Sequence, residues 1–136
     1  HFLNDVPGPG IFDDIIIKDF FCGKALPPEE IKGLLVPMAP ILLEGFCDIG
    51  NLYISNIHRE EHTEALPLIA CNVDSDRPVI ADTRIRSLTI ENCTMINHLQ
   101  EELELFHNRG RIDNLTLRNN HLYSAPGAGA CRESNL

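Results

Sequence analysis

Four segments of the chain share one pattern of apolar and polar positions. In each copy the first, fourth and sixth positions are apolar and the eighth is Asp or Asn, and the copies lie at 12–19, 49–56, 85–92 and 112–119. The fourth and sixth positions flank a single residue and are filled by Ile and Leu. This alternation is typical of a short strand with one buried face. The pattern therefore predicts one strand in each copy.

A second, shorter apolar run precedes three of the four copies, at 41–43, 68–70 and 103–106. The repeating unit is therefore predicted to be a strand, a turn and a second strand, with insertions of variable length. A strand with one buried face cannot bury that face alone, so successive units are expected to stack on one another. We expect residues 1–123 to form a solenoid of about four coils. Residues 124–136, rich in Gly, Ala and Ser, are expected to form a flexible tail or linker.

The eighth position of each copy is polar, and it is occupied by Asp19, Asn56, Asn92 and Asn119. Stacked amides can donate to one neighbour and accept from the other, so these residues are expected to form an interior ladder. Asn also tolerates a left-handed backbone at a tight turn. Asn92 and Asn114 each begin a formal glycosylation sequon, but their place within predicted strands favours a chance match. A structural role is therefore predicted for this position.

Two of the repeats carry a family resemblance. Residues 84–95 and 102–119 resemble the right-handed parallel β-helix proteins of the pectate-lyase and polygalacturonase type, in which short strands ending in Asn recur with a paired strand between them. The resemblance covers about residues 12–123. It implies an all-β fold that recognises or processes carbohydrate as part of a larger glycosidase, lyase or phage tailspike. It also implies an extracellular or virion-surface location, although an odd number of cysteines keeps the cytoplasm open.

Leucine-rich repeats are the rival, because residues 85–95 and 112–122 match their consensus. That α/β solenoid would be a non-catalytic protein-interaction module with a helix over 96–106. The β-helix instead predicts a strand at 103–106 and a turn at 108–110. We favour the strand, because comparable runs precede the second and third copies. A purely structural coil segment is a third hypothesis.

Candidate catalytic residues lie in the first copy. Residues 12–18 resemble the polygalacturonase motif in which adjacent aspartates precede an apolar strand ending in Lys. Glycosidases use two carboxyl groups, one as an acid and one ionised. The resemblance therefore implies Asp13 and Asp14 as acid and base, and Lys18, Arg84 and Arg86 as substrate-binding residues. Their alternative role is in a turn before the strand, and the Gly-His-Gly motif of the family and Trp platforms are absent. A polysaccharide hydrolase or lyase activity thus stays open.

One further motif is a possible metal site. Residues 58–62 read His-Arg-Glu-Glu-His and match the H-x-x-E-H pattern of inverted zinc proteases, in which a helix brings both histidines to one face. The segment follows a predicted strand and lies in an insertion. We therefore expect solvated loop histidines, and no metal or other cofactor.

The composition and charge of the chain limit the classes of partner that we expect. The 136 residues carry a formal charge of −9 and no cluster of Lys and Arg along the sequence, so nucleic acid is not an expected partner. The longest apolar runs, at 34–43 and 65–71, are shorter than the about 20 residues of a membrane span, so no membrane partner is expected. Five Cys without a CxxC pair favour reduced thiols packed in the core. The expected partners are polysaccharide and the neighbouring coils of a longer chain or a homotrimer.

Overall fold

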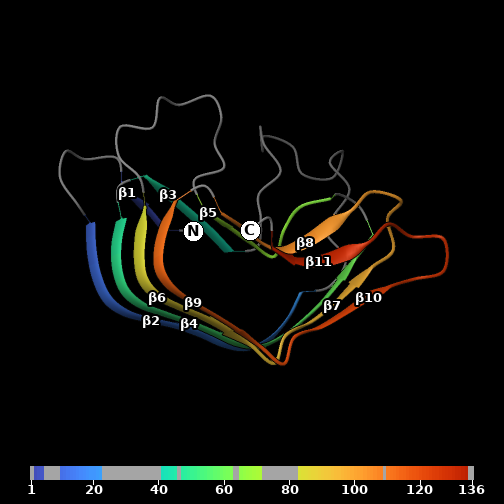
Figure 1. Ribbon diagram of the computed structural model, residues 1–136, viewed down its shortest axis with the longest axis horizontal. Helices are drawn as coiled ribbons and strands as arrows, with labels where there is room; N and C mark the ends of the chain where they lie inside the picture. The colour runs from blue at the N-terminus through green and yellow to red at the C-terminus, as the bar shows by residue number, and fades with distance from the viewer. Residues whose placement is uncertain are drawn as a thin grey trace.

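The computed structural model describes residues 2–4, 10–22, 41–45, 47–62, 65–71, 83–108 and 110–134. These residues form strands and connecting turns and contain no helix (Figure 1). The all-β prediction is confirmed for this part of the chain. None of its elements is therefore a helix long and apolar enough to cross a membrane.

The strands form two sheets, and every strand pair within them is parallel. The five-stranded sheet has the order β1 (Phe2–Asn4), β3 (Ile41–Gly45), β5 (Ile69–Cys71), β8 (Leu103–Asn108), β11 (Cys131–Ser134). The six-stranded sheet has the order β10 (His121–Ser124), β7 (Thr94–Asn97), β4 (Cys47–Glu61), β6 (Arg84–Glu91), β9 (Arg111–Arg118), and β2 (Gly10–Cys22) pairs with β4. The chain crosses repeatedly from one sheet to the other, although β6 and β7, and likewise β9 and β10, are consecutive strands of the six-stranded sheet.

The four repeat copies lie side by side on the six-stranded sheet in the register that the sequence predicts. Their first positions form one row across the sheet, made by Phe12, Ile49, Ile85 and Ile112. The fourth and sixth positions form two further rows in the same way. The shorter apolar runs form β3, β5 and β8, which pair with one another in the other sheet. The repeat therefore predicted both the strands and their partners.

The segment that separates the two fold hypotheses is strand rather than helix. Residues 94–97 form β7 and residues 103–108 form β8, so the helix expected of a leucine-rich repeat is absent from these described residues. The predicted turn at 108–110 includes residue 109, which lies outside the described residues; on either side of it, Asn108 Oδ1 accepts a hydrogen bond from the Gly110 amide at 2.9 Å. The leucine-rich repeat alternative is therefore wrong for this segment.

The eighth position of each copy adopts a left-handed backbone, as predicted. The φ angles are 60° at Asp19, 53° at Asn56, 55° at Asn92 and 53° at Asn119. The expected interior location is wrong, because all four side chains are exposed. The six-stranded sheet bends around the core (Figure 1). The exposure of these four side chains shows that they point away from the core. On this outer surface the four residues form two hydrogen-bonded pairs, in which Asn56 donates to Asp19 at 2.9 Å and Asn119 donates to Asn92 at 2.6 Å.

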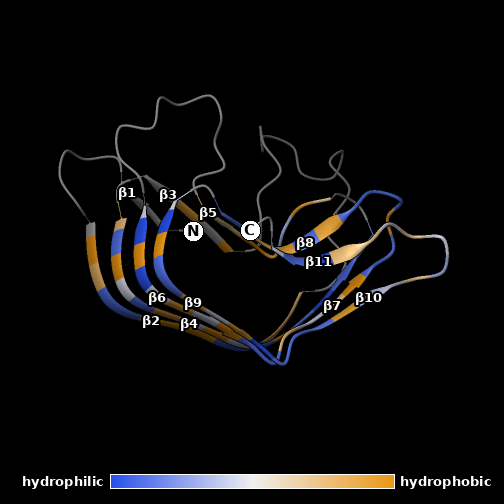
Figure 2. Ribbon diagram, viewed as in Figure 1, coloured by the Kyte–Doolittle hydropathy of each residue, from blue (hydrophilic) through white to orange (hydrophobic). Residues whose placement is uncertain are grey.

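The core lies between the two sheets and contains the inward side chains of the repeat. Its fully buried members include Ile54, Leu88, Ile90 and Phe106. Hydrophobic and hydrophilic segments alternate along β2, β4, β6 and β9, as expected for strands with one buried face (Figure 2).

None of the five cysteines, all of which belong to the described part of the chain, forms a disulfide, in agreement with the expectation of reduced thiols. Cys47, Cys71 and Cys93 are buried, and Cys22 and Cys131 are half-buried. Burial raises the pKa of the Cys131 thiol to about 11, so this thiol is protonated at neutral pH. These residues therefore pack as small apolar groups.

The two ends of the stack are less covered than its middle. The inward side chains of β2 and β9 are only partly buried, although they pack against the core, and they include Phe12, Ile15, Ile112 and Leu115. The C-terminal segment, expected to be a tail or linker, contains β11, which pairs with β8. Before β11, the Gly129 amide donates to the carbonyl of Leu99 at 2.8 Å. Part of this segment is therefore hydrogen-bonded to β8 and to the residues that precede it.

Candidate functional site

The polar residues on the outward side of β2, β4, β6 and β9 form a surface that we call the polar face; the outward apolar residues of β2, Ile11, Ile16 and Phe21, are not part of it. Its residues are Asp13, Asp14, Lys18, Asp48, Asn51, Tyr53, Arg84, Arg86, Glu91, Arg111, Asp113, Asn114 and Arg118. They point outward because the apolar positions between them fill the core. All five site residues predicted from the sequence lie on this face.

Asp13 and Asp14 are both exposed because the strand places two outward residues between its inward first and fourth positions. They lie within β2 rather than in a turn before it. The Asp14 Oδ1 accepts a hydrogen bond from the Asn51 Nδ2 of β4 at 2.8 Å. Position 50 beside them requires glycine, since a Cβ there would lie 2.5 Å from the carbonyl oxygen of Asp13. The two carboxylates thus sit at a close approach of β2 and β4.

Arg84 and Arg86 leave β6 in opposite directions. Arg84 donates to Asp113 of β9, with its Nη2 2.7 Å from Oδ2. Arg86 donates to Asp48 of β4, with its Nη2 3.2 Å from Oδ2. These hydrogen bonds are the main reason that the pKa values of Asp48 and Asp113 lie below the usual value. Both carboxylates are therefore ionised at neutral pH.

A third polar cluster spans three strands around Glu91. Tyr53 of β4 donates to Glu91 through its hydroxyl, and Arg118 of β9 donates through its Nε at 2.8 Å. The hydrogen bond from Tyr53, followed by that from Arg118, lowers the pKa of Glu91. The two partners cover this carboxylate, so its side chain is only 11% exposed. Glu91 thus fixes the orientation of an aromatic hydroxyl and a guanidinium.

The polar face gathers arginines that are scattered along the sequence. Arg84, Arg86, Arg111 and Arg118 all lie on β6 and β9. The sequence shows no cluster of basic residues, and the parallel register creates one in space. Three carboxylates, Asp48, Glu91 and Asp113, pair with these arginines. The local charge is therefore close to neutral, in contrast to the strongly acidic chain as a whole.

The face unites the predicted residues without bringing all of them into contact. Strand β4 lies between β2, which carries Asp13, Asp14 and Lys18, and β6, which carries Arg84 and Arg86. Lys18 is exposed and lies in the row of Ser55. The carboxylate pair and the arginine pair are thus separate parts of one surface.

Reasoning from single motifs missed Asp48, Tyr53, Glu91, Asp113 and Arg118. Their signal was in the repeat itself. When the four copies are aligned, the seventh position contains Glu91 directly before Arg118, and this is the ion pair that the structure shows. Aligning the four copies therefore shows which outward residues lie side by side on neighbouring strands, and a search for single motifs does not.

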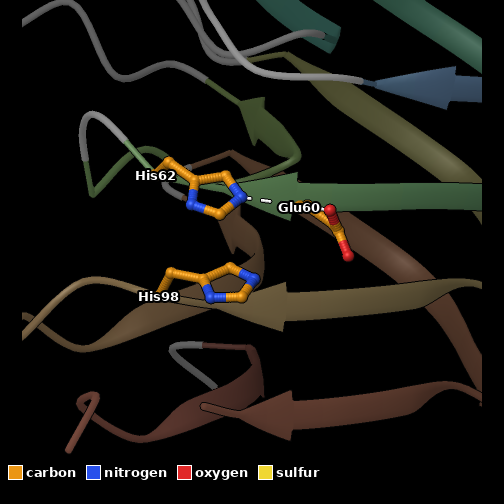
Figure 3. Close-up of side chains that lie close together, drawn as sticks. All are labelled: Glu60, His62 and His98. Atoms are coloured by element: carbon orange, nitrogen blue, oxygen red, sulfur yellow. Dashed lines mark ion pairs between the residues drawn. The ribbon is translucent and has the colours of Figure 1, made fainter.

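The histidine motif lies on a strand rather than a helix or a loop, because residues 58–61 belong to β4. On a strand, alternate residues share a face, so His58, Glu60 and His62 point outward while Arg59 and Glu61 are buried. The His58 ring stacks on Phe21 with centroids 5.1 Å apart. His62 stacks instead on His98, with centroids 4.0 Å apart (Figure 3). The carboxylate of the motif, Glu61, therefore does not face its histidines.

Comparisons with known proteins add no family to this geometry. No family model, no curated protein and no solved structure matches the chain.

Proposed function

We propose that the chain is a segment of a right-handed parallel β-helix whose polar face binds polysaccharide. The parallel pairing in both sheets and the repeated crossing of the chain between them support this fold. Connections between parallel strands of one sheet are right-handed in nearly all proteins, which supports a right-handed helix. The observation that carries the function is the network of arginines, carboxylates and amides that spans the four strands.

The chemistry of this face suits sugars. Sugar hydroxyl groups donate and accept hydrogen bonds, and the rows of the face offer donors and acceptors about 4.8 Å apart, which is the spacing of neighbouring strands. Arg86, Arg111 and Arg118 remain more than half exposed, so their other N–H groups face solvent. Guanidinium groups bind carboxylates with two parallel hydrogen bonds. An acidic polysaccharide such as polygalacturonate is therefore the first ligand to test.

Binding is tested by titrating the chain with polygalacturonate and, separately, with a neutral glucan in a calorimeter. Arg118→Ala should weaken polygalacturonate binding about tenfold, because it removes a charge-assisted contact. Arg132→Ala is the matched control, since Arg132 is an exposed arginine on β11 outside the polar face that pairs with Glu102. No measurable binding, or an equal loss in the control, would contradict the proposal.

Within the same proposal, Asp13 and Asp14 act as acid and base if the polysaccharide is also cleaved, with Lys18, Arg84 and Arg86 holding the substrate. Their exposure on β2 and the hydrogen bond from Asn51 to Asp14 support this assignment. The test is the release of reducing ends from polygalacturonate by the Asp13→Asn/Asp14→Asn double variant. Cleavage should be lost, whereas Glu102→Gln, an exposed acid outside the face, should keep it. Unchanged cleavage would remove both aspartates from the mechanism.

A structural coil segment is the second candidate, and the ends of the stack favour it. The outward residues Ile11, Ile16 and Phe21 of β2 are 71%, 64% and 63% exposed, beside inward residues that are only partly buried. Neighbouring coils of a longer chain, or copies in a homotrimer on an extracellular or virion surface, would cover them. Sedimentation should then show a concentration-dependent trimer. A monomer at all concentrations would contradict the trimer.

A further inference from the structure

We propose that Glu60, His62 and His98 form a binding site for a divalent transition-metal ion of the Zn²⁺ class. One nitrogen of each imidazole and one carboxylate oxygen lie within 4.8 Å of one another. The side chains come from two neighbouring strands and lie close together at one surface (Figure 3). This site lies at the end of β4 and does not depend on polysaccharide binding.

The parallel pairing of β4 and β7 brings the three residues together. Glu60 pairs with Ile96 and Glu61 with Asn97, so His62 and His98 are the residues that directly follow the paired ends of the two strands. The amide of His98 donates to the carbonyl of Glu61 at 3.0 Å, which continues the ladder by one step. Strand alternation then places Glu60 on the same face as His62. The register therefore brings His62 next to His98, which lies 36 residues later in the sequence.

The backbone beside His98 is held in place by a buried amide. Asn97 is fully buried, and its Nδ2 donates to the carbonyls of Glu101 at 2.8 Å and Gly129 at 3.0 Å. Its Oδ1 accepts from the Leu99 amide at 2.9 Å. These bonds pin the turn that follows β7, so His98 is presented from a fixed backbone. A fixed backbone reduces the ordering that metal binding requires.

The side chains already lie near a ligating arrangement. The His62 Nε2 is 3.9 Å from the Glu60 Oε2, and the two imidazole planes are inclined by 13°. A metal ion lies in the plane of each imidazole that binds it, so one ring must rotate out of the stack. Zn–N and Zn–O bonds are about 2.0–2.2 Å long, so the ligand atoms must also draw closer together. Both movements are side-chain rotations at an exposed surface.

The donor set selects the class of ion. Two imidazole nitrogens and one carboxylate suit Zn²⁺, Ni²⁺ or Cu²⁺, whereas Mg²⁺ and Ca²⁺ prefer oxygen ligands. Three protein ligands leave a coordination position for water on a tetrahedral ion. The formal charge of −9 on the chain attracts cations to its surface.

The test is calorimetric titration of the full chain with ZnCl₂. We expect one ion to bind at this site, and His62→Ala, His98→Ala and Glu60→Gln each to weaken its binding at least about tenfold. His107→Ala is the matched control, because His107 also contacts a carboxylate, with its Nδ1 2.6 Å from the Glu104 Oε2, but lies outside the cluster. This variant should bind Zn²⁺ as the original chain does, and an excess of MgCl₂ should not compete.

A second readout separates loss of the site from loss of folding. ZnCl₂ should raise the thermal midpoint of the original chain and of His107→Ala, and shift the imidazole proton resonances of His62 and His98. Variants of the cluster should keep the β-strand circular dichroism spectrum but lose the rise in midpoint. Unchanged Zn²⁺ affinity in His62→Ala and His98→Ala, or an equal loss in His107→Ala, would overturn the proposal.

Discussion

At the residue scale, the most unusual pair is the buried one formed by Arg59 and Glu61. Both side chains point into the core from β4, with exposed fractions of 3% and 7%, and Arg59 Nη2 contacts the Glu61 carboxylate. The Nη1 of Arg59 is buried without a hydrogen-bond partner among the described residues. A buried ion pair contributes little net stability, because removing two charges from water offsets their attraction, but deleting one partner leaves the other charge buried without it.

We therefore expect Arg59→Met to lower the free energy of unfolding by about 3–5 kcal/mol, because Glu61 would remain charged and buried. The double variant Arg59→Met/Glu61→Leu should recover most of that loss, since neither charge remains. Urea unfolding measures both variants. A single variant as stable as the original chain would contradict the buried location of this pair.

The left-handed residues offer a second test at this scale. Asn92 has a φ of 55° and accepts a hydrogen bond from Asn119. Asn92→Ala should lower the free energy of unfolding by about 1–2 kcal/mol, because Ala tolerates this backbone poorly. Asn92→Gly loses the same side chain but adopts the angle without strain, so it should be the more stable variant. If urea unfolding shows Asn92→Ala to be more stable than Asn92→Gly, the fold does not impose a left-handed φ at position 92.

At the element scale, the rows of the repeat predict a gradient of burial. Ile85 is fully buried in the middle of its row, whereas Ile112 at the end is only partly buried. Ile85→Ala should cost about 2–5 kcal/mol of unfolding free energy, as large-to-small changes in cores do. Ile112→Ala should cost clearly less, since its neighbours can relax toward solvent. Equal costs in urea unfolding would mean that β9 is not at the end of the stack.

The predictable part of the fold follows from these inward rows. Positions such as Ile54 and Ile90 repeat because each must fill the same core, so aligning the copies gave both the strands and their register. Outward positions such as Tyr53 and Thr89 also lie in one row across the sheet. They do not have to fill the core, so their residue types vary. The histidine motif was expected in a loop, whereas residues 58–61 continue β4, which buries Glu61 and directs His58 and His62 outward. An i and i+4 spacing places two residues on one face of a helix or of a strand, so the spacing alone did not identify the strand.

The site was predictable only in part. Asp13, Asp14, Lys18, Arg84 and Arg86 were found through resemblance, and the repeat explains why they share a sheet face. Their partners depend on how far each side chain reaches across strands. Arg84 reaches forward to β9 and Arg86 back to β4, and nothing in the local sequence sets these directions. The ion pairs between side chains of neighbouring strands could therefore not be predicted from the sequence.

At the scale of the whole molecule, the ionised carboxylates of the polar face predict a loss of stability in acid. The pKa values of Asp48, Glu91 and Asp113 are lower in the folded chain than their usual values, mainly through hydrogen bonds from Arg86, Tyr53 and Arg84 respectively. The unfolded chain then binds more protons, so stability rises with pH in this range. The contribution is present above the unfolded pKa values of about 4 and is lost as the pH falls through the folded values.

This acid dependence is measured by urea unfolding between pH 7 and pH 2. Arg86→Ala should flatten the curve, because Asp48 loses the partner that lowers its pKa. The change should be small and should shrink in high salt, since the pair is exposed to solvent. Arg132→Ala, outside the polar face, should leave the contribution of Asp48 unchanged. A curve that Arg86→Ala does not alter would contradict this role of the pair.

The central claim is that the four repeat copies form one parallel stack, because the polar face and the histidine cluster both follow from its register. The most direct test is methyl NMR of the chain labelled at Ile and Leu. Nuclear Overhauser cross-peaks should connect methyl groups of neighbouring copies in each row, namely Ile49 with Ile85, Leu52 with Leu88 and Ile54 with Ile90. Absence of these cross-peaks, with contacts between unrelated positions of the copies instead, would contradict the stack.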